Sequence, residues 1–197
     1  KSLYKPRSPA EKRVFSQEVA FIISHILSDN VARQAEFGPN SFLSVPGKTV
    51  AVKTGTTNDK RDNWTVGYTN DVTVGVWVGN NDNSPMNQQI ASGITGASPI
   101  WFNITSQLLK KYKDGIISKP DKVKALIIDA YLGGLPKDGQ PTRSEYFIEG
   151  NEPKDASPFY KKLKISKANG KLANDIEIKQ GNYDEKECIV ITESDPV

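Results

Sequence analysis

The sequence has almost no cysteine and almost no histidine. Among 197 residues there is one of each, Cys188 and His25. A single cysteine cannot form a disulfide within the chain, and we expect its thiol to act as a small apolar side chain rather than as a nucleophile. A single histidine without a matching nucleophile and carboxylate argues against a Ser-His-Asp triad and against a histidine metal site. The composition therefore predicts no histidine metal site.

Long apolar runs and an excess of one charge are also missing. The longest apolar stretch, Val19 to Leu27, is interrupted by Ser24 and His25 and is too short to cross a bilayer, so we expect no membrane span. Lysine and arginine number 26 against 23 acidic residues, a net charge of +3. Because no basic stripe stands out, nucleic acid is not an expected partner.

What the sequence does contain predicts two amphipathic helices. Residues 1–13 carry two prolines and five Lys or Arg residues and read as a connector. From Ser16, a suitable N-cap, apolar residues recur at steps of three and four up to residue 27. A second helix is predicted from about Pro99, which suits a first helical turn, with apolar Ile100, Ile104 and Leu108 at helical spacing.

Strand-like runs lie between and after these helices. Residues 50–54, 64–69 and 72–78 predict an antiparallel three-stranded meander, with Asn70-Asp71 as a tight turn. After about residue 119 the composition changes, and residues 123–128 and 189–192 are predicted strands. The expected fold class is α+β: an antiparallel β-sheet with flanking helices, followed by a β-rich or irregular C-terminal extension. The expected domains are residues 1–118 and 119–197.

The segment with the most chemical content is Lys53-Thr54-Gly55-Thr56-Thr57. It places an ammonium, three hydroxyls and a glycine at the end of a predicted strand, where Lys53 and Gly55 share one face and Thr54 and Thr56 the other. Such a strand edge suits an anionic, peptide-like ligand that adds main-chain hydrogen bonds. The motif is short, and a strand end with solvated lysine and threonine side chains is the simpler alternative.

Further segments share their order and spacing with one known family. Together with the lysine-threonine-glycine motif, they resemble the transpeptidase domain of the bifunctional (class A) penicillin-binding proteins over roughly residues 15 to 112. Residues 142–147 and 152–153 resemble, more weakly, the C-terminal extensions of some of these proteins. The segments that carry the main resemblance are Ile26–Asn30, Ala32-Arg33, Phe37-Gly38, Val50–Thr57, Asp62–Thr69, Val74–Asp82 and Gly96–Trp101.

This resemblance implies an activity and a role for each matching residue. In the family, a serine attacks a D-Ala-D-Ala stem peptide or a β-lactam and becomes acylated. Lys53 would pair with the ligand carboxylate, and the backbone N–H of Thr56 would donate to the oxyanion, which makes Thr56 the expected catalytic residue. Gly55 would let the loop of the serine approach. Lys53, Thr54, Gly55, Thr56 and Thr57 are thus the expected substrate-binding residues, whereas Trp64 and Trp77 are expected to pack the sheet.

The resemblance also implies what this chain does not supply. The family needs a Ser-x-x-Lys nucleophile motif and a Ser-x-Asn motif upstream of Lys53. Ser2–Lys5 has the letters of the first motif but lies in the basic connector, and Ser28–Asn30 spells the second but is expected to end its helix. We therefore expect a fragment of a peptidoglycan transpeptidase that is inactive alone and that uses no metal and no organic cofactor.

The expected partners and location follow from the same resemblance. The partners are peptidoglycan stem peptides, β-lactams and the upstream part of the same domain, and the expected location is the extracytoplasmic face of the bacterial membrane, reached through an anchor outside this chain. Two alternatives stay open. The chain could be a non-catalytic module that binds cell-wall peptide or protein, or residues 119–197 could be a partner-docking domain.

Overall fold

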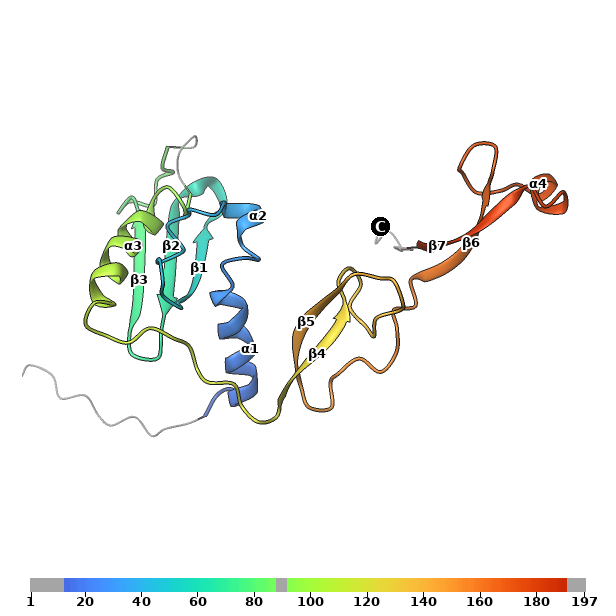
Figure 1. The fold of residues 1–197 in the computed structure, drawn as a ribbon. Helices are drawn as coiled ribbons and strands as arrows, with labels where there is room; N and C mark the ends of the chain where they lie inside the picture. The colour runs from blue at the N-terminus through green and yellow to red at the C-terminus, as the bar shows by residue number, and fades with distance from the viewer. Residues whose placement is uncertain (1–12, 88–91, 191–197) are drawn as a thin grey trace, which may run out of the picture. The chain divides into compact units, whose positions relative to one another are not determined.

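A computed structural model describes residues 13–87 and 92–190 of the chain (Figure 1). The chain divides into two compact units, Lys1–Val123 and Lys124–Val197. The first unit contains a three-stranded sheet with helices, and the second contains two β-hairpin sheets. This is the predicted α+β class. The division falls near the domain boundary expected after residue 118, and the identity of the two domains stays a prediction.

The first helix begins where the sequence predicts. Helix α1 spans Gln17–Ser28, and the hydroxyl of its N-cap, Ser16, accepts the N–H of Val19 at 3.3 Å. Its C-terminal end is closed by Asp29, whose Oδ1 accepts the N–H groups of Val31 and Ala32, each at 2.9 Å. The segment Ser28–Asn30 therefore ends the helix, as expected. A short helix, α2 (Gln34–Phe37), follows.

The predicted meander is present, with each strand paired to the next along the chain. Strand β1 spans Ala51–Thr56, β2 spans Asp62–Tyr68 and β3 spans Thr73–Gly79, in the antiparallel order β1-β2-β3. A single 3₁₀ turn, η1 (Asn58–Lys60), joins β1 to β2. Helix α3 (Ala97–Leu108) packs on β2 and β3, whereas α1 packs on β1.

The core of the first unit lies between the sheet and α3. Trp101 of α3 is fully buried, and its neighbours in the core include Val52, Val74 and Val76. The ring of Trp101 fits only because β2 has glycine at position 67. A Cβ atom there would lie 2.3 Å from Cζ2 of the tryptophan. This contact fixes how closely α3 approaches the sheet.

The second unit has more regular structure than the sequence predicts. Strand β4 (Val123–Asp129) confirms the strand predicted at residues 123–128. Of the strand predicted at residues 189–192, Ile189 is the last residue of β7 (Tyr183–Ile189) and Val190 is not in a strand, whereas residues 191 and 192 lie outside the described part. The unit consists of two sheets, β4-β5 and β6-β7, and a short capped helix. Its elements are β4 (Val123–Asp129), β5 (Thr142–Ile148), β6 (Tyr160–Ser166), α4 (Asp175–Lys179) and β7 (Tyr183–Ile189).

Two polar contacts join these hairpins. The hydroxyl of Tyr160 donates to Oδ2 of buried Asp129 at 2.5 Å, and Nζ of Lys137 lies 2.9 Å from Oε1 of Glu187. The hydrogen bond to Asp129 raises the pKa of Tyr160 to about 12. The pKa of Asp129 is lowered, first by this hydrogen bond and then by the backbone N–H of Leu132. The hairpins are therefore held together partly by an ionised carboxylate.

Replacing Gly67 by alanine should destabilise the first unit. The new methyl group has to displace the buried ring of Trp101, and overpacking of this kind costs about 1–3 kcal/mol. Gly75→Ala is the matched control, because a Cβ there would come no nearer than 3.9 Å to Val66. Urea unfolding of both variants measures the difference. Equal midpoints for Gly67→Ala and Gly75→Ala would refute the close contact.

Removing the Tyr160 hydroxyl should loosen the second unit. Tyr160→Phe deletes the donor to Asp129, and we expect a lower thermal midpoint. Tyr183→Phe is the control, since its ring, which faces the ammonium of Lys164, is kept.

The contribution of Asp129 should also depend on pH in a defined direction. Because its folded pKa is lowered, the stabilisation is complete above the ordinary carboxyl pKa and is lost as pH falls through the folded pKa. Thermal melts from neutral to acidic pH should show the midpoints of the unchanged chain and Tyr160→Phe converging. A constant gap at every pH would contradict the coupling.

Candidate functional site

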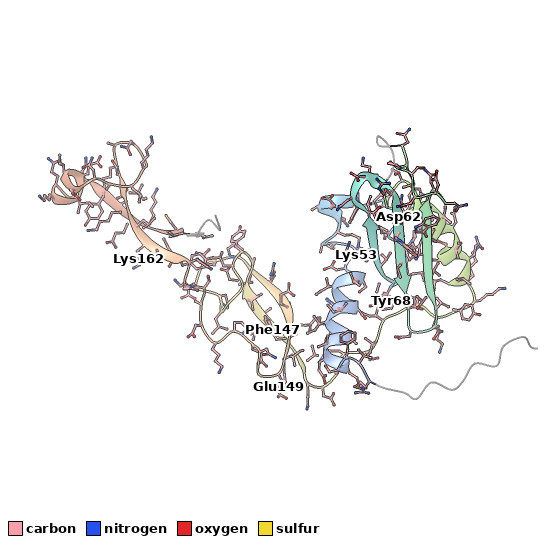
Figure 2. All side chains as sticks on the ribbon, turned by 180° about the vertical axis from the view of Figure 1, so that it is seen from behind. Lys53, Asp62, Tyr68, Phe147, Glu149 and Lys162 are labelled. Atoms are coloured by element: carbon pink, nitrogen blue, oxygen red, sulfur yellow. The ribbon has the colours of Figure 1, made fainter. Side chains whose placement is uncertain are left out.

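The lysine-threonine-glycine motif lies on an outer strand of the sheet. Within the described residues, β1 pairs with β2 only, so one edge of β1 has no strand beside it. Direct cross-strand partners are Thr54 with Thr65, Gly55 with Trp64, and Thr56 with Asn63. Because partners in an antiparallel pair point to the same face, Lys53 and Gly55 lie on one face and Thr54 and Thr56 on the other, as predicted. Lys53 is exposed (Figure 2), and its Nζ donates to the carbonyl oxygen of Thr54 at 2.7 Å.

The hydroxyl of Thr56 is fixed by a segment far away in sequence. The backbone N–H of Gly93 donates to Thr56 Oγ1 at 3.1 Å. The same glycine passes so close to β1 that a Cβ atom on it would lie 2.9 Å from Cβ of Thr54. The turn that precedes α3 therefore rests on the Thr54–Thr56 face of the strand and holds the end of the motif in place.

Buried polar side chains anchor this turn to β2. Ser98 Oγ donates to the carbonyl oxygen of Gly93 at 2.6 Å and lies 2.9 Å from Thr65 Oγ1. Asn63 Oδ1 accepts the N–H of Ala97, the first residue of α3, at 2.9 Å. Asn63, Thr65 and Ser98 are all nearly inaccessible to solvent. Buried hydrogen bonds of this kind are costly to leave unpaired, so the network gives the turn one position.

These supporting residues were missed at the sequence level. None of them belongs to a recognisable motif: they are Gly93, Ser98, Asn63 and Thr65. Their role depends on contacts between residues far apart in sequence, such as Gly93 and Thr56, which are 37 positions apart. The one available signal was the glycine pair, Gly93 and Gly96, directly before a predicted helix. Gly96 also meets Asn63, since a Cβ on it would lie 2.7 Å from the amide nitrogen.

Gly55 differs from these glycines. A Cβ at position 55 would meet only Cβ of Trp64, at 3.9 Å, which is an ordinary contact. No described residue of this chain therefore requires glycine there. The space beside Gly55 is open on the face that also carries Lys53.

The last residue of the motif takes part in a turn. The N–H of Thr57 donates to the carbonyl oxygen of Asp62 at 3.1 Å, and the N–H of Asp62 donates to Thr57 Oγ1 at 3.0 Å. Asp62 and Tyr68 mark the two ends of β2 (Figure 2). The Thr57 hydroxyl thus closes the turn after β1, and its role in ligand binding stays a prediction.

The two tryptophans are less buried than expected. Trp64 and Trp77 are opposite each other across β2 and β3, yet they remain 46% and 41% exposed. The indole N–H of Trp77 donates to Oδ2 of Asp62 at 3.0 Å. They lie on the face of Lys53 and Gly55, and within the described residues neither is enclosed by the core.

A small pocket of about 290 Å³ adjoins Lys53 at the unpaired edge of β1. Its wall is organised by Arg33, whose guanidinium donates to the carbonyl oxygens of Leu27, Asp29 and Leu43. Burial lowers the pKa of Arg33, although the guanidinium remains charged at neutral pH. Arg33 therefore holds the segment beside β1 in place, and Lys53 is the exposed cation of the motif.

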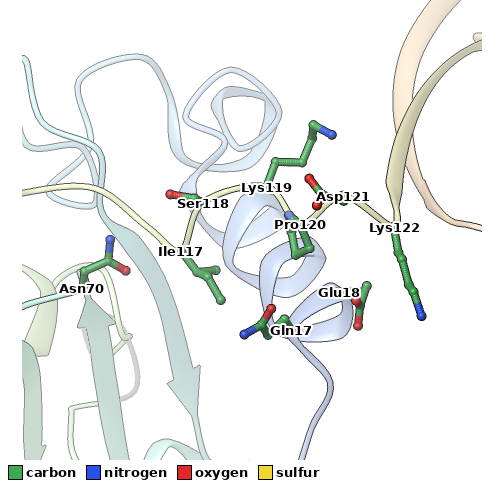
Figure 3. Close-up of a pocket in the computed structure, with 9 residues that line it drawn as sticks. All are labelled: Gln17, Glu18, Asn70, Ile117, Ser118, Lys119, Pro120, Asp121 and Lys122. Carbon is green, nitrogen blue, oxygen red and sulfur yellow. The ribbon is translucent and has the colours of Figure 1, made fainter.

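A larger hollow of about 620 Å³ contains none of the predicted residues (Figure 3). It is lined by the start of α1, by Asn70 and by residues 117–122 of the segment that follows α3. Glu18 in this hollow has a lowered pKa, chiefly because the hydroxyl of Ser16 donates to it. The hollow is open to solvent and none of the motif residues lines it, so we place the candidate site at β1.

Residues 13–87 and 92–190 contain neither a cluster of metal ligands nor a membrane-spanning helix. In this part of the chain no three His, Cys, Asp or Glu side chains come together as a metal site. None of its helices has the length and apolar character needed to span a bilayer.

Comparison with known proteins agrees with the geometry. No family model matches the chain. Penicillin-binding protein 1A of Clostridium botulinum is 28% identical over 181 residues, 88% of this chain and 21% of that protein. Penicillin-binding protein 1A/1B of Bacillus subtilis is 30% identical over 176 residues, 79% of this chain and 18% of that protein. Penicillin-binding protein 1A of Pseudomonas aeruginosa is 31% identical over 134 residues, 68% of this chain and 16% of that protein.

A solved structure of another penicillin-binding protein is also similar to this chain. The crystal structure of penicillin-binding protein 1A from Haemophilus influenzae superposes with a TM-score of 0.50 and 30% identity, over 57% of this chain and 16% of that one. The chain spans about a fifth of the length of the curated relatives it matches. With the meander, the motif strand and the packed helix in the expected order, this chain corresponds to part of a class A penicillin-binding protein.

Proposed function

We propose that this chain forms part of a peptidoglycan D,D-transpeptidase and that β1 binds the donor stem peptide. The observation that carries the proposal is the unpaired edge of β1, where Lys53 is exposed, the space beside Gly55 is open and Thr56 is held by Gly93. A peptide ligand can add to such an edge through main-chain hydrogen bonds.

Each residue of the motif has a task in this reaction. Lys53 attracts the terminal carboxylate of the peptide, and Thr54 and Thr56 donate hydrogen bonds to the ligand. The N–H of Thr56 donates to the oxygen of the penultimate carbonyl as a serine attacks that carbon. An oxyanion donor of this kind contributes on the order of 3 kcal/mol to the transition state. The terminal D-Ala then leaves, and an acceptor amine releases the acyl group from the serine.

The attacking serine is assigned to a part of the protein outside these 197 residues. Ser28, the serine of the Ser-x-Asn sequence here, donates to the carbonyl oxygen of His25 at 3.0 Å and belongs to the end of α1. The Ser2–Lys5 sequence lies outside the described residues. We therefore propose that the chain has no transpeptidase activity by itself.

An exposed apolar stripe on α1 supports a packing partner for this unit. Val19, Ile23 and Ile26 are 39%, 48% and 59% exposed and follow one another at helical spacing. An apolar stripe of this kind normally packs against another element. In the proposed transpeptidase, the preceding part of the domain covers it.

The remaining expectations follow from this activity. The substrates are stem peptides of peptidoglycan, β-lactams bind the same edge of β1, and the reaction takes place on the extracytoplasmic face of the bacterial membrane. No cofactor takes part, because acyl transfer through a serine needs only the nucleophile, a base and the oxyanion donors.

Labelling of the full-length protein with a fluorescent penicillin tests this proposal. We expect a covalent adduct on a serine outside residues 1–197. Lys53→Ala should lower the second-order labelling rate roughly 10- to 100-fold, because a charge-assisted hydrogen bond contributes about 1.5–3 kcal/mol. Lys111→Ala, a change of the same type at an exposed lysine in the segment after α3, should label at the rate of the unchanged protein.

Gly55→Ala separates ligand binding from folding. Since the new methyl group meets only Trp64 at 3.9 Å, the melting temperature should be unchanged while labelling falls. No adduct in the unchanged protein would favour the alternative, a non-catalytic module that binds cell-wall peptide. An adduct within residues 1–197 would show that the nucleophile was misplaced.

A further inference from the structure

Both polar groups of the Gly93 backbone are held, one by the motif strand and the other by α3. The N–H of Gly93 donates to Thr56 Oγ1 at 3.1 Å. Its carbonyl oxygen accepts the N–H of Ser98 at 2.9 Å and the hydroxyl of Ser98 at 2.6 Å. Glycine has more backbone freedom than any other residue, so these contacts decide the direction of its N–H. A change at Ser98 is therefore transmitted to Thr56.

The hydroxyl protons of this network have one consistent order. Ser98 and Thr65 are both fully buried, and each hydroxyl has a single proton to donate. A carbonyl oxygen can only accept, so the short contact of 2.6 Å assigns the proton of Ser98 to Gly93. In the contact of 2.9 Å between Ser98 and Thr65, the donor is then Thr65. Thr65 orients Ser98, and Ser98 orients Gly93.

Thr56 is the residue that this network restrains. It is the last residue of β1, its side chain is exposed, and it has a strand partner on one side only, Asn63 of β2. The ends of secondary-structure elements open readily unless other contacts hold them. The hydrogen bond from Gly93 supplies such a contact at the end of the motif strand.

We propose that Ser98 is a positioning residue for the acylation step: by holding Gly93 against Thr56, it keeps the backbone N–H of Thr56 where the oxyanion forms. The inference rests on the proposed function, in which this N–H is an oxyanion donor. Such a donor acts mainly in the transition state, and small displacements of it lower the rate. Ser98 therefore governs the acylation rate more than the initial affinity, whereas Lys53, on the opposite face of β1, attracts the ligand carboxylate.

Labelling of the full-length protein at several concentrations of a fluorescent penicillin separates these two quantities. Ser98→Ala should lower the limiting acylation rate about five- to ten-fold, less than the loss of a whole oxyanion donor, because the N–H of Thr56 is still present. The half-saturating concentration should change less than about two-fold, since interactions of the transition state do not contribute to initial binding. Ser106→Ala is the matched control and should label like the unchanged protein. It removes a hydroxyl from the same helix, and Ser106 Oγ has no hydrogen-bond partner among the described residues.

A double-mutant cycle with Thr56→Val tests whether Ser98 acts through Thr56. Valine keeps the backbone N–H and the branched shape but has no hydroxyl to accept from Gly93. In this background, Ser98→Ala should slow labelling less than about two-fold further, because the coupled contact is already gone. Thr56→Ser keeps the acceptor and should restore the full effect of Ser98→Ala. In a comparison cycle, the effects of Ser98→Ala and Lys53→Ala should multiply.

The outcomes divide as follows. Equal labelling of Ser98→Ala and the unchanged protein would overturn the inference and leave the proposed function intact. So would an equal loss in the Thr56→Val background, which would indicate a general effect on folding, or a loss confined to the half-saturating concentration. If Ser98→Ala is unfolded at the assay temperature, Thr65→Val enters the same cycle, with an expected loss of about two- to five-fold. An unchanged protein that takes up no penicillin would overturn the proposed function and this inference together.

Discussion

The hydrogen bond from Gly93 to Thr56 is the contact on which the geometry of the first unit depends. It joins the turn before α3 to the end of β1, across 37 positions of sequence. Because a side chain at position 93 would collide with Thr54, the turn can lie this close only with glycine there. The helix start, the sheet and the motif strand are thereby fixed relative to one another. A ligand that binds β1 therefore meets a strand whose position is fixed by the turn on its Thr54–Thr56 face.

The elements nearest the motif were predictable because their signals are local. Ser16 as N-cap, the helical spacing after it, and the alternation in the three strands all act over a few residues. The separation of Lys53 and Thr54 onto opposite faces follows from the two-residue period of a strand. These features needed no knowledge of tertiary structure, and the structure contains them.

The support of the site was not predictable in the same way. Asn63 and Ser98 are ordinary polar residues in sequence, and a buried polar residue contradicts the usual assignment of such residues to the surface. Ser98 Oγ and Asn63 Oδ1 are hydrogen-bonded across the sheet-helix boundary, which offsets part of the cost of burial, whereas Nδ2 of Asn63 has no partner among the described residues. The second unit was predicted poorly for a related reason. Its β6 and β7 strands are rich in charge, with Lys162 paired to Glu187, so the usual apolar pattern is absent.

The glycines of the first unit fall into two kinds. At some of them a Cβ atom would collide with a neighbouring residue of this chain, and at others it would not. Gly93 and Gly67 are required by contacts within this chain, with Thr54 and Trp101 respectively. Gly55 has no such contact, although strand interiors normally disfavour glycine because it adds conformational entropy and buries no side chain. Gly75 of β3 is equally free of close contacts, so open space alone does not assign a function. Gly55 differs because it lies on the motif strand, on the face that also carries Lys53. In the proposed transpeptidase, the substrate and the loop that carries the serine both approach the strand at Gly55.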